Sequence, residues 1–148
     1  MPNREVLIVD DKPHELFWLT KILKEEHGCT IQHLANEKDA KDHLDFLVEG
    51  DRMPYALGII DIMIPVAKLE DLFEIDDNFL EKSRNTGLRV CRHIRQKLKI
   101  TANTLPLIAI SARGDNELID QLQEIDICFF SRDDQNIKDH LQEILTQK

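Results

Sequence analysis

Two adjacent carboxylates, Asp10 and Asp11, follow directly after an aliphatic run at residues 6–9. One Asp is enough to accept hydrogen bonds from a turn and to begin a helix, so the second carboxylate needs another partner. A third carboxylate, Asp61, lies inside the apolar run at residues 56–63, where an isolated charge would be costly. Ser111 ends another apolar run. These four side chains are the first candidates for chemistry.

Three converging carboxylates repel one another, and at least one of them would have its pKa raised. A hard divalent cation removes this penalty, and a site with few carboxylates favours Mg²⁺, which keeps several waters and binds phosphate oxygens. We therefore expect a magnesium and phosphoryl site, with Asp61 as the nucleophile that forms an aspartyl-phosphate. Ser111 would donate a hydrogen bond to a phosphate oxygen, and the small side chain of Ala112 leaves room for the group.

Five short apolar runs alternate with segments of helical periodicity and would bring these residues together. The runs cover residues 6–11, 29–34, 56–63, 106–111 and 127–131, and the stripes between them, expected to be core contacts, cover 16–23, 40–48, 90–98, 118–125 and 137–145. This alternation predicts an α/β fold, with a doubly wound parallel sheet covered by helices on both faces. The first, third and fourth runs are almost wholly apolar, as in strands buried on both faces. Ligands of such sheets bind at the carboxyl ends of the strands, where all four candidates lie.

The composition is that of one globular domain spanning residues 1–148, with 42% hydrophobic and 32% charged residues. No apolar run approaches the roughly 20 residues that span a bilayer, so we expect no membrane partner. The net charge of −9 argues against direct nucleic-acid binding. Cys29, Cys91 and Cys128 form no CxxC pair, which predicts buried thiols in a reducing cytoplasm.

The segments VLIVDD, IIDIMIP and IAISA, in this order and with this alternation, resemble the receiver domain of two-component response regulators over nearly the whole chain. The resemblance implies a flavodoxin-like, five-stranded sheet in the order 2-1-3-4-5. It implies Mg²⁺ bound by Asp11, Asp61 and the backbone carbonyl of Met63, with Asp10 acting largely through water. It also implies that Asp61 accepts a phosphoryl group from a histidine kinase or phosphotransfer protein and that Ser111 is the switch residue.

The sequence departs from the receiver pattern after the fifth run. Receivers have a Lys–Pro pair there, and the preferred alignment places Arg132 at the lysine and Asp133 at the proline. Arg132 keeps the positive charge, but its guanidinium is a rigid fork instead of a compact point charge. A register shifted by one residue is the alternative. In the preferred register, Phe129 takes the position of the receivers' aromatic switch.

A second departure lies between Pro65, which matches the proline of the receivers' phosphoacceptor loop, and Gly87, which matches the small turn before the next helix. The chain inserts residues 66–85 here, with six acidic and three basic residues in the stretch. The segment would form either a short helix packed against the body or an acidic flap. It would gate kinase access, form a docking surface, or have no effect on the chemistry.

The function expected from these observations is that of a receiver, a switch and not an enzyme. We expect it to stand alone, since no DNA-binding module follows the last helical stripe. Output would pass through a downstream partner protein on the face of residues 118–125, 127–131 and 137–145, and a homodimer is a further candidate assembly. The alternative is a pseudo-receiver that signals by protein contact without phosphorylation. Two other readings are disfavoured, a chance alignment of solvated turn residues and a haloacid-dehalogenase-type phosphohydrolase, which needs an Asp where Met63 stands.

Overall fold

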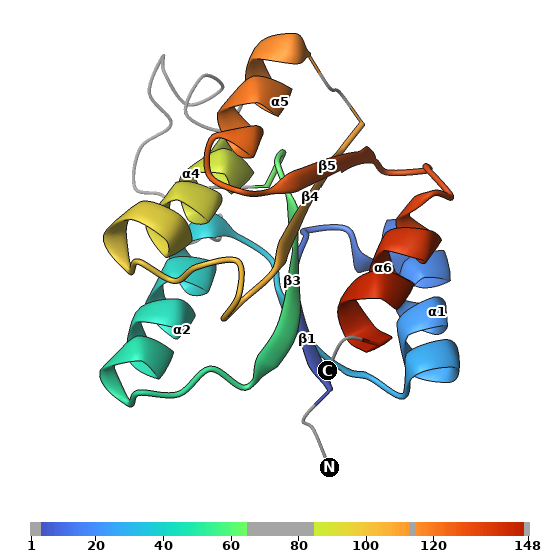
Figure 1. Cartoon of the computed structure of the whole chain (residues 1–148), viewed down its shortest axis with the longest axis horizontal. Helices are drawn as coiled ribbons and strands as arrows, with labels where there is room; N and C mark the ends of the chain where they lie inside the picture. The colour runs from blue at the N-terminus through green and yellow to red at the C-terminus, as the bar shows by residue number, and fades with distance from the viewer. Residues whose placement is uncertain (1–3, 65–84, 113–114, 147–148) are drawn as a thin grey trace.

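The computed structural model describes residues 4–64, 85–112 and 115–146. Its centre is a parallel sheet of five strands in the order β2-β1-β3-β4-β5 (Figure 1). The strands are β1 Glu5–Val9, β2 Thr30–Leu34, β3 Tyr55–Asp61, β4 Leu107–Ser111 and β5 Cys128–Ser131. Each lies within or overlaps one of the five apolar runs, and the predicted strand order is confirmed.

Helices cover both faces of the sheet (Figure 1). The 3-10 turn η1 Pro13–Leu16 leads into α1 Phe17–His27. The other helices in the described part of the chain are α2 Glu37–Glu49, α4 Thr86–Arg92, α5 Asn116–Gln123 and α6 Ile137–Thr146, and α4 continues into the π-helical turn η3 His93–Lys97. One core cluster lies under α1 and α6, and the other lies under α2, α4 and α5. The predicted two-sided architecture is therefore confirmed.

The burial of each strand follows its place in the sheet. Every residue of β3 and β4 is buried, as are residues 6–9 of β1, whereas the edge strands β2 and β5 are partly exposed. Successive side chains of a strand point to opposite faces, so Leu7 and Val9 enter one core cluster and Val6 and Ile8 enter the other. A strand buried on both faces has few ways to shift its register, which fixes where its carboxyl end lies.

Helix ends follow local side-chain chemistry. The side chain of Asn36 accepts a hydrogen bond from the backbone N–H of Asp39 and begins α2, and that of Asp115 does the same for Leu118 and α5. Gly28 ends α1 with a φ of 65°, in the left-handed region that glycine adopts without steric cost. These caps fix where α1 ends and where α2 and α5 begin.

Two predicted core residues are exposed. Val48 is 39% exposed because it lies on the outer face near the end of α2, where Phe46 is 61% exposed. Cys128 is exposed because it begins the edge strand β5, whereas Cys29 and Cys91 are buried as predicted. All three are free thiols. Pro65 and nearly all of the predicted insertion, residues 66–84, lie outside the described residues.

Across residues 4–64, 85–112 and 115–146, no helix is long and apolar enough to cross a membrane.

Candidate functional site

The register of the sheet brings the predicted site residues to one edge. Val9 of β1 pairs with Ile60 of β3. The next residue in each case, Asp10 and Asp61, therefore lies at the carboxyl end of its strand, beside the other. One carboxylate oxygen from each of Asp10, Asp11 and Asp61 lies within 4.8 Å of the others. The convergence expected from the alternation of strands and helices is thus present in the structure.

The inner two carboxylates are buried and held by backbone donors. Asp10 is 0% exposed and Asp61 is 4% exposed, while Asp11 lies further out. The N–H of Lys12 donates to Oδ1 of Asp10 at 3.1 Å, and the N–H of Met63 donates to Oδ1 of Asp61 at 3.0 Å. Each carboxylate therefore has one oxygen fixed by the loop that follows its own strand.

The second oxygen of each buried carboxylate accepts a hydrogen bond from Arg132. Nη1 of Arg132 donates to Oδ2 of Asp61 at 2.6 Å, and Nη2 donates to Oδ2 of Asp10 at 3.0 Å. Ser111 pairs with Ser131 across β4 and β5, which places Arg132 one residue beyond the strand end. Arg132, which the preferred alignment places at the lysine position, therefore contacts both buried aspartates.

Glu15 also contacts Arg132, and the sequence did not single it out. Its Oε2 lies 3.1 Å from Nη2 of Arg132, so the guanidinium is held by three carboxylates. Glu15 belongs to η1, the turn that directly follows the Asp10–Asp11 pair. An acidic side chain four residues after Asp11, in the turn that begins above the site, was the available signal.

Burial and charge act in opposite directions on this cluster. Burial raises the pKa of Asp61, and the nearby charge of Asp10 adds to this, whereas the Met63 N–H and Arg132 favour the carboxylate. Burial opposes the charge of Arg132, but its hydrogen bond to Asp10 and the charges of Asp10 and Asp61 outweigh burial and raise its pKa. Arg132 is therefore always cationic, and any further positive charge at the site would stabilise the ionised form of Asp61.

A close backbone contact fixes the chain just after Asp61. The N–H of Gly87 donates to the carbonyl of Ile62 at 2.9 Å, and the N–H of Ile62 donates to the carbonyl of Ile110 at 3.0 Å. A Cβ at position 87 would overlap the carbonyl oxygen of Asp61. Glycine at the start of α4 therefore lets the helix approach the end of β3.

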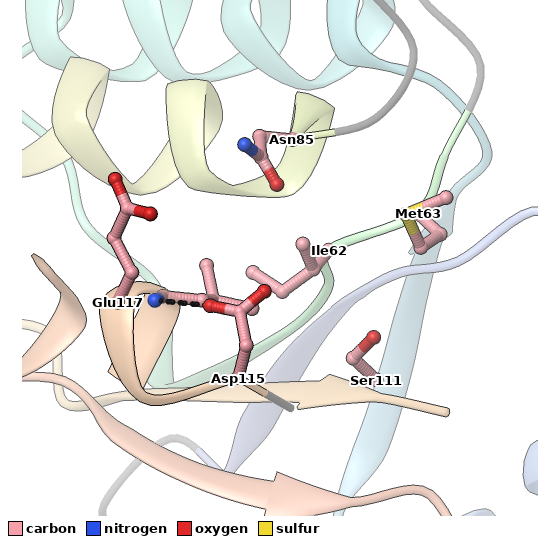
Figure 2. Close-up of a pocket in the computed structure, with 7 residues that line it drawn as sticks. Ile62, Met63, Asn85, Ser111, Asp115 and Glu117 are labelled. Atoms are coloured by element: carbon pink, nitrogen blue, oxygen red, sulfur yellow. Dashed lines mark hydrogen bonds between the residues drawn. The ribbon is translucent and has the colours of Figure 1, made fainter. Parts of the chain in front are cut away.

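A small cavity lies beside the cluster, between the end of β3 and the beginnings of α4 and α5 (Figure 2). It has a volume of about 180 Å³ and is lined by Ile62, Met63, Asn85, Ser111, Asp115, Glu117 and Leu118. Figure 2 shows Ser111 at the end of β4 and Met63 in the loop that follows β3, with Asp115 bonded to a backbone N–H at the start of α5. Ser111 is 1% exposed, so its hydroxyl is confined to the interior beside this space.

The donor set fits a hard divalent cation. Three carboxylates within 4.8 Å offer the oxygen ligands that Mg²⁺, Mn²⁺ and Ca²⁺ accept. Met63, whose backbone carbonyl is the fourth predicted ligand, lies in the loop directly after Asp61 and is 40% exposed. Arg132 already bonds one oxygen of Asp10 and one of Asp61, so a cation at this site would share those carboxylates with a guanidinium.

Comparison with known proteins identifies the fold. No protein-family model matches the chain, and no curated protein matches it in sequence. Among solved structures, a two-component response regulator from Cytophaga hutchinsonii superposes with a TM-score of 0.70 at 18% identity, with 100% of both chains covered. The receiver domain of the Francisella response regulator 1452 gives 0.63 at 21% identity, with 98% of each chain covered.

A third similar structure is the Mn²⁺-bound form of the response regulator Rcp1, with a TM-score of 0.61 at 17% identity, covering 97% of this chain and 90% of that one. At such identities the likeness concerns the backbone. The chain therefore has the fold of response regulator receiver domains, with an acidic cluster that fits the metal site of such domains.

Proposed function

We propose that the chain is a response regulator receiver that accepts a phosphoryl group on Asp61 from the phosphohistidine of a histidine kinase or phosphotransfer protein. The observation that carries the proposal is the convergence of Asp10, Asp11 and Asp61 at the carboxyl edge of a receiver fold. A buried carboxylate between two others has little structural use by itself, because its repulsion lowers stability. A cation and a phosphoryl group would give the cluster a function.

Asp61 is positioned to act as the nucleophile. The Met63 N–H holds Oδ1, and Oδ2 would attack phosphorus; the new O–P bond forms as the P–N bond of phosphohistidine breaks, and the departing imidazole takes a proton from solvent. Mg²⁺ held by Asp11, Asp61 and the Met63 carbonyl, with Asp10 supporting it, would neutralise the equatorial phosphoryl oxygens. Nη1 of Arg132, now on Asp61, would donate to a phosphoryl oxygen.

The phosphoryl group would change the protein through the cavity beside Ser111. Phosphorylation adds about −1.5 to −2 charges at neutral pH, and the Ser111 hydroxyl would move to donate to the new oxygens. Downstream, the face formed by α5, β5 and α6 is the proposed docking surface for a partner protein, and Figure 1 shows β5 between these two helices. We also propose a cytoplasmic setting, which three free thiols support, and a switch instead of an enzyme acting on a separate substrate.

A pseudo-receiver is the second candidate, and one observation favours it. Arg132 is a permanent internal cation that bonds both buried aspartates, so the cluster has a counterion without any metal. In that case the fold would signal through protein contacts alone. The two functions differ in whether a phosphoryl mimic binds at the cluster.

Mg²⁺ followed by beryllofluoride, read by melting temperature and by amide NMR, distinguishes the candidates. For a receiver, Mg²⁺ raises the melting temperature because it binds only the folded cluster, and Asp11→Ala removes most of that gain. Asp42→Ala, an exposed carboxylate on α2, is the matched control and keeps the gain. Beryllofluoride then shifts the signals of Ser111 and of the α5, β5 and α6 face, and Asp61→Asn abolishes those shifts.

Failure of Mg²⁺ to change the wild-type protein would refute the metal site. A Mg²⁺ response without a beryllofluoride response would favour the pseudo-receiver.

A further inference from the structure

Arg132 is bonded on two sides, and the outer side is unlike the inner one. Its two inner partners, Asp10 and Asp61, are buried, whereas the Glu15 side chain is 43% exposed. Among the residues that the structure describes, Nη2 contacts both Asp10 and Glu15, and Nη1 contacts Asp61. The guanidinium can therefore lose its contact with Asp61 and still be held through Nη2.

The backbone places Glu15 at this position. The N–H of Glu15 donates to the carbonyl of Lys12 at 3.0 Å, and Pro13 begins the turn with its fixed φ. Leu16, the next residue, is 1% exposed and anchors the turn in the core under α1. The Glu15 side chain is thereby kept at the rim of the site, in contact with Arg132.

The backbone also fixes the other partner. The N–H of Arg132 donates to the carbonyl of Ser111 at 3.2 Å, which ties the residue to the end of β4. The N–H of Asp134 donates to the carbonyl of Ser131 at 3.1 Å and closes a turn around Arg132. Both ends of the Glu15–Arg132 pair thus lie on anchored backbone.

We propose that Glu15 is a positioning residue of the phosphoryl site, which keeps Arg132 at the site when Nη1 leaves Asp61 for a cation and a phosphoryl group. This inference rests on the proposed function. Its chemical basis is that a divalent cation and a guanidinium compete for the same oxygens of Asp10 and Asp61. Glu15 gives the displaced guanidinium a carboxylate partner at the rim, so competition with Arg132 lowers the affinity for the cation less.

The shape of arginine is what makes such a partner useful. A lysine ammonium is a compact charge on a flexible stem, whereas the guanidinium is a planar fork whose two terminal nitrogens can bond different carboxylates. The planar group can therefore stay on Glu15 through one nitrogen and turn the other toward a new acceptor. Glu15 would thus compensate for the arginine that stands in the place of the receivers' lysine.

The competing interpretation is an ordinary surface ion pair. Pairs between exposed side chains contribute little, typically about 0–1 kcal/mol, and would not affect metal affinity beyond a screened charge effect. The two interpretations differ in one respect. Only a positioning role makes the effect of Glu15 on the cation depend on Arg132.

A double-mutant cycle on Mg²⁺ affinity tests the role, measured by titration calorimetry at about 0.15 M salt, where surface charges are screened. The proteins are wild type, Glu15→Gln, Arg132→Gln, the double variant, and Glu25→Gln. Glu25 is an exposed carboxylate of α1, about 12 Å along the helix from Phe17, so its replacement removes the same charge away from the site.

We expect Glu15→Gln to weaken Mg²⁺ binding by about threefold to tenfold and Glu25→Gln to change it by less than about twofold. Arg132→Gln removes the competing cation and should strengthen binding by at least about tenfold. In the Arg132→Gln background, the effect of Glu15→Gln should fall below about twofold.

Two different results would overturn the inference. If wild type binds Mg²⁺ and Glu15→Gln has the same effect with and without Arg132, or no effect, the positioning role is wrong while the proposed function stands. If neither wild type nor any variant binds Mg²⁺, the proposed function fails, and the role of Glu15 fails with it.

Discussion

At the scale of single residues, charge balance decides what the site can do. Asp10 and Asp61 are too buried to remain as neighbouring anions without compensation, and Arg132 supplies one positive charge through two separate nitrogens. Asp11 lies outside this pairing and is the most exposed of the three aspartates, so it is the one most accessible to an entering cation. Arg132 therefore balances part of the negative charge of the site, and the carboxylates can still serve as ligands of a metal cation.

The sequence predicted these residues unequally. The three aspartates could be found because each follows or interrupts an apolar run, where a carboxylate is out of place. Arg132 could be placed only by comparison with a lysine, and its two-sided bonding could not be predicted, because that depends on the rotation of the side chain toward Asp10 and Asp61. Glu15 was missed because its contact joins η1 to the end of β5, far apart in the sequence.

Glu37, a buried carboxylate away from Asp10 and Asp61, gives a prediction that does not involve the site. It accepts two hydrogen bonds from Arg89, at 2.9 and 3.0 Å, and lies 2.8 Å from the ammonium of Lys41. Burial alone would raise the pKa of Glu37, but these bonds and charges outweigh burial, and the pKa is lowered below its ordinary value of 4.5. The pair joins the first turn of α2 to α4.

Because the folded protein favours ionised Glu37, the stabilisation is present above pH 4.5 and is lost as the pH falls through the lowered pKa. Glu37→Gln should lower the free energy of unfolding by about 1–2 kcal/mol at pH 7, and no more, because Arg89 is partly exposed and water screens part of its charge. Urea unfolding over a pH series should show this difference shrinking below pH 4.5. Glu49→Gln, an exposed position at the end of α2, should leave stability nearly unchanged; a Glu37 difference independent of pH would refute the assignment.

At the scale of elements, the junction of β3 with α4 holds the proposed nucleophile in place. β3 is buried along its whole length, and α4 begins against its carboxyl end through Gly87. The alternation of apolar runs predicted both elements. The π-helical turn η3, in which the N–H of Leu98 donates to the carbonyl of His93, was not predicted, because neither glycine nor proline marks it in the sequence.

Gly87→Ala tests this junction. The added Cβ would overlap the carbonyl of Asp61, and the nearest atoms are all backbone atoms of Asp61 and Ile62, which have little room to relax. The free energy of unfolding should therefore fall by about 1–3 kcal/mol. Chemical denaturation measures the change. The matched control is Gly50→Ala after α2, where φ is −85° and the new Cβ meets only ordinary contacts.

At position 50, alanine should be neutral or stabilising by up to about 1 kcal/mol, since it restricts the unfolded chain. Equal effects of the two substitutions would show that the approach of α4 to Asp61 is not tightly packed.

At the scale of the whole molecule, the fold is shared far more widely than the sequence. Structures with 17–21% identity superpose with TM-scores of 0.61–0.70, although no family model matches the chain. The fold depends on the order of apolar strands and amphipathic helices, which many sequences satisfy, so it could be predicted from alternation and a few motifs. The inserted segment could not, because its short helical periodicity fits either a packed helix or a flap.

The intact mass of the protein after incubation with a small phosphodonor and Mg²⁺ tests the central claim, that Asp61 accepts a phosphoryl group. The wild-type protein should gain the mass of one phosphoryl group, and so should Asp42→Asn, which alters an exposed carboxylate of α2. Asp61→Asn, and wild type with Mg²⁺ removed by a chelator, should gain none. No gain in wild type, or an equal gain in Asp61→Asn, would contradict the account.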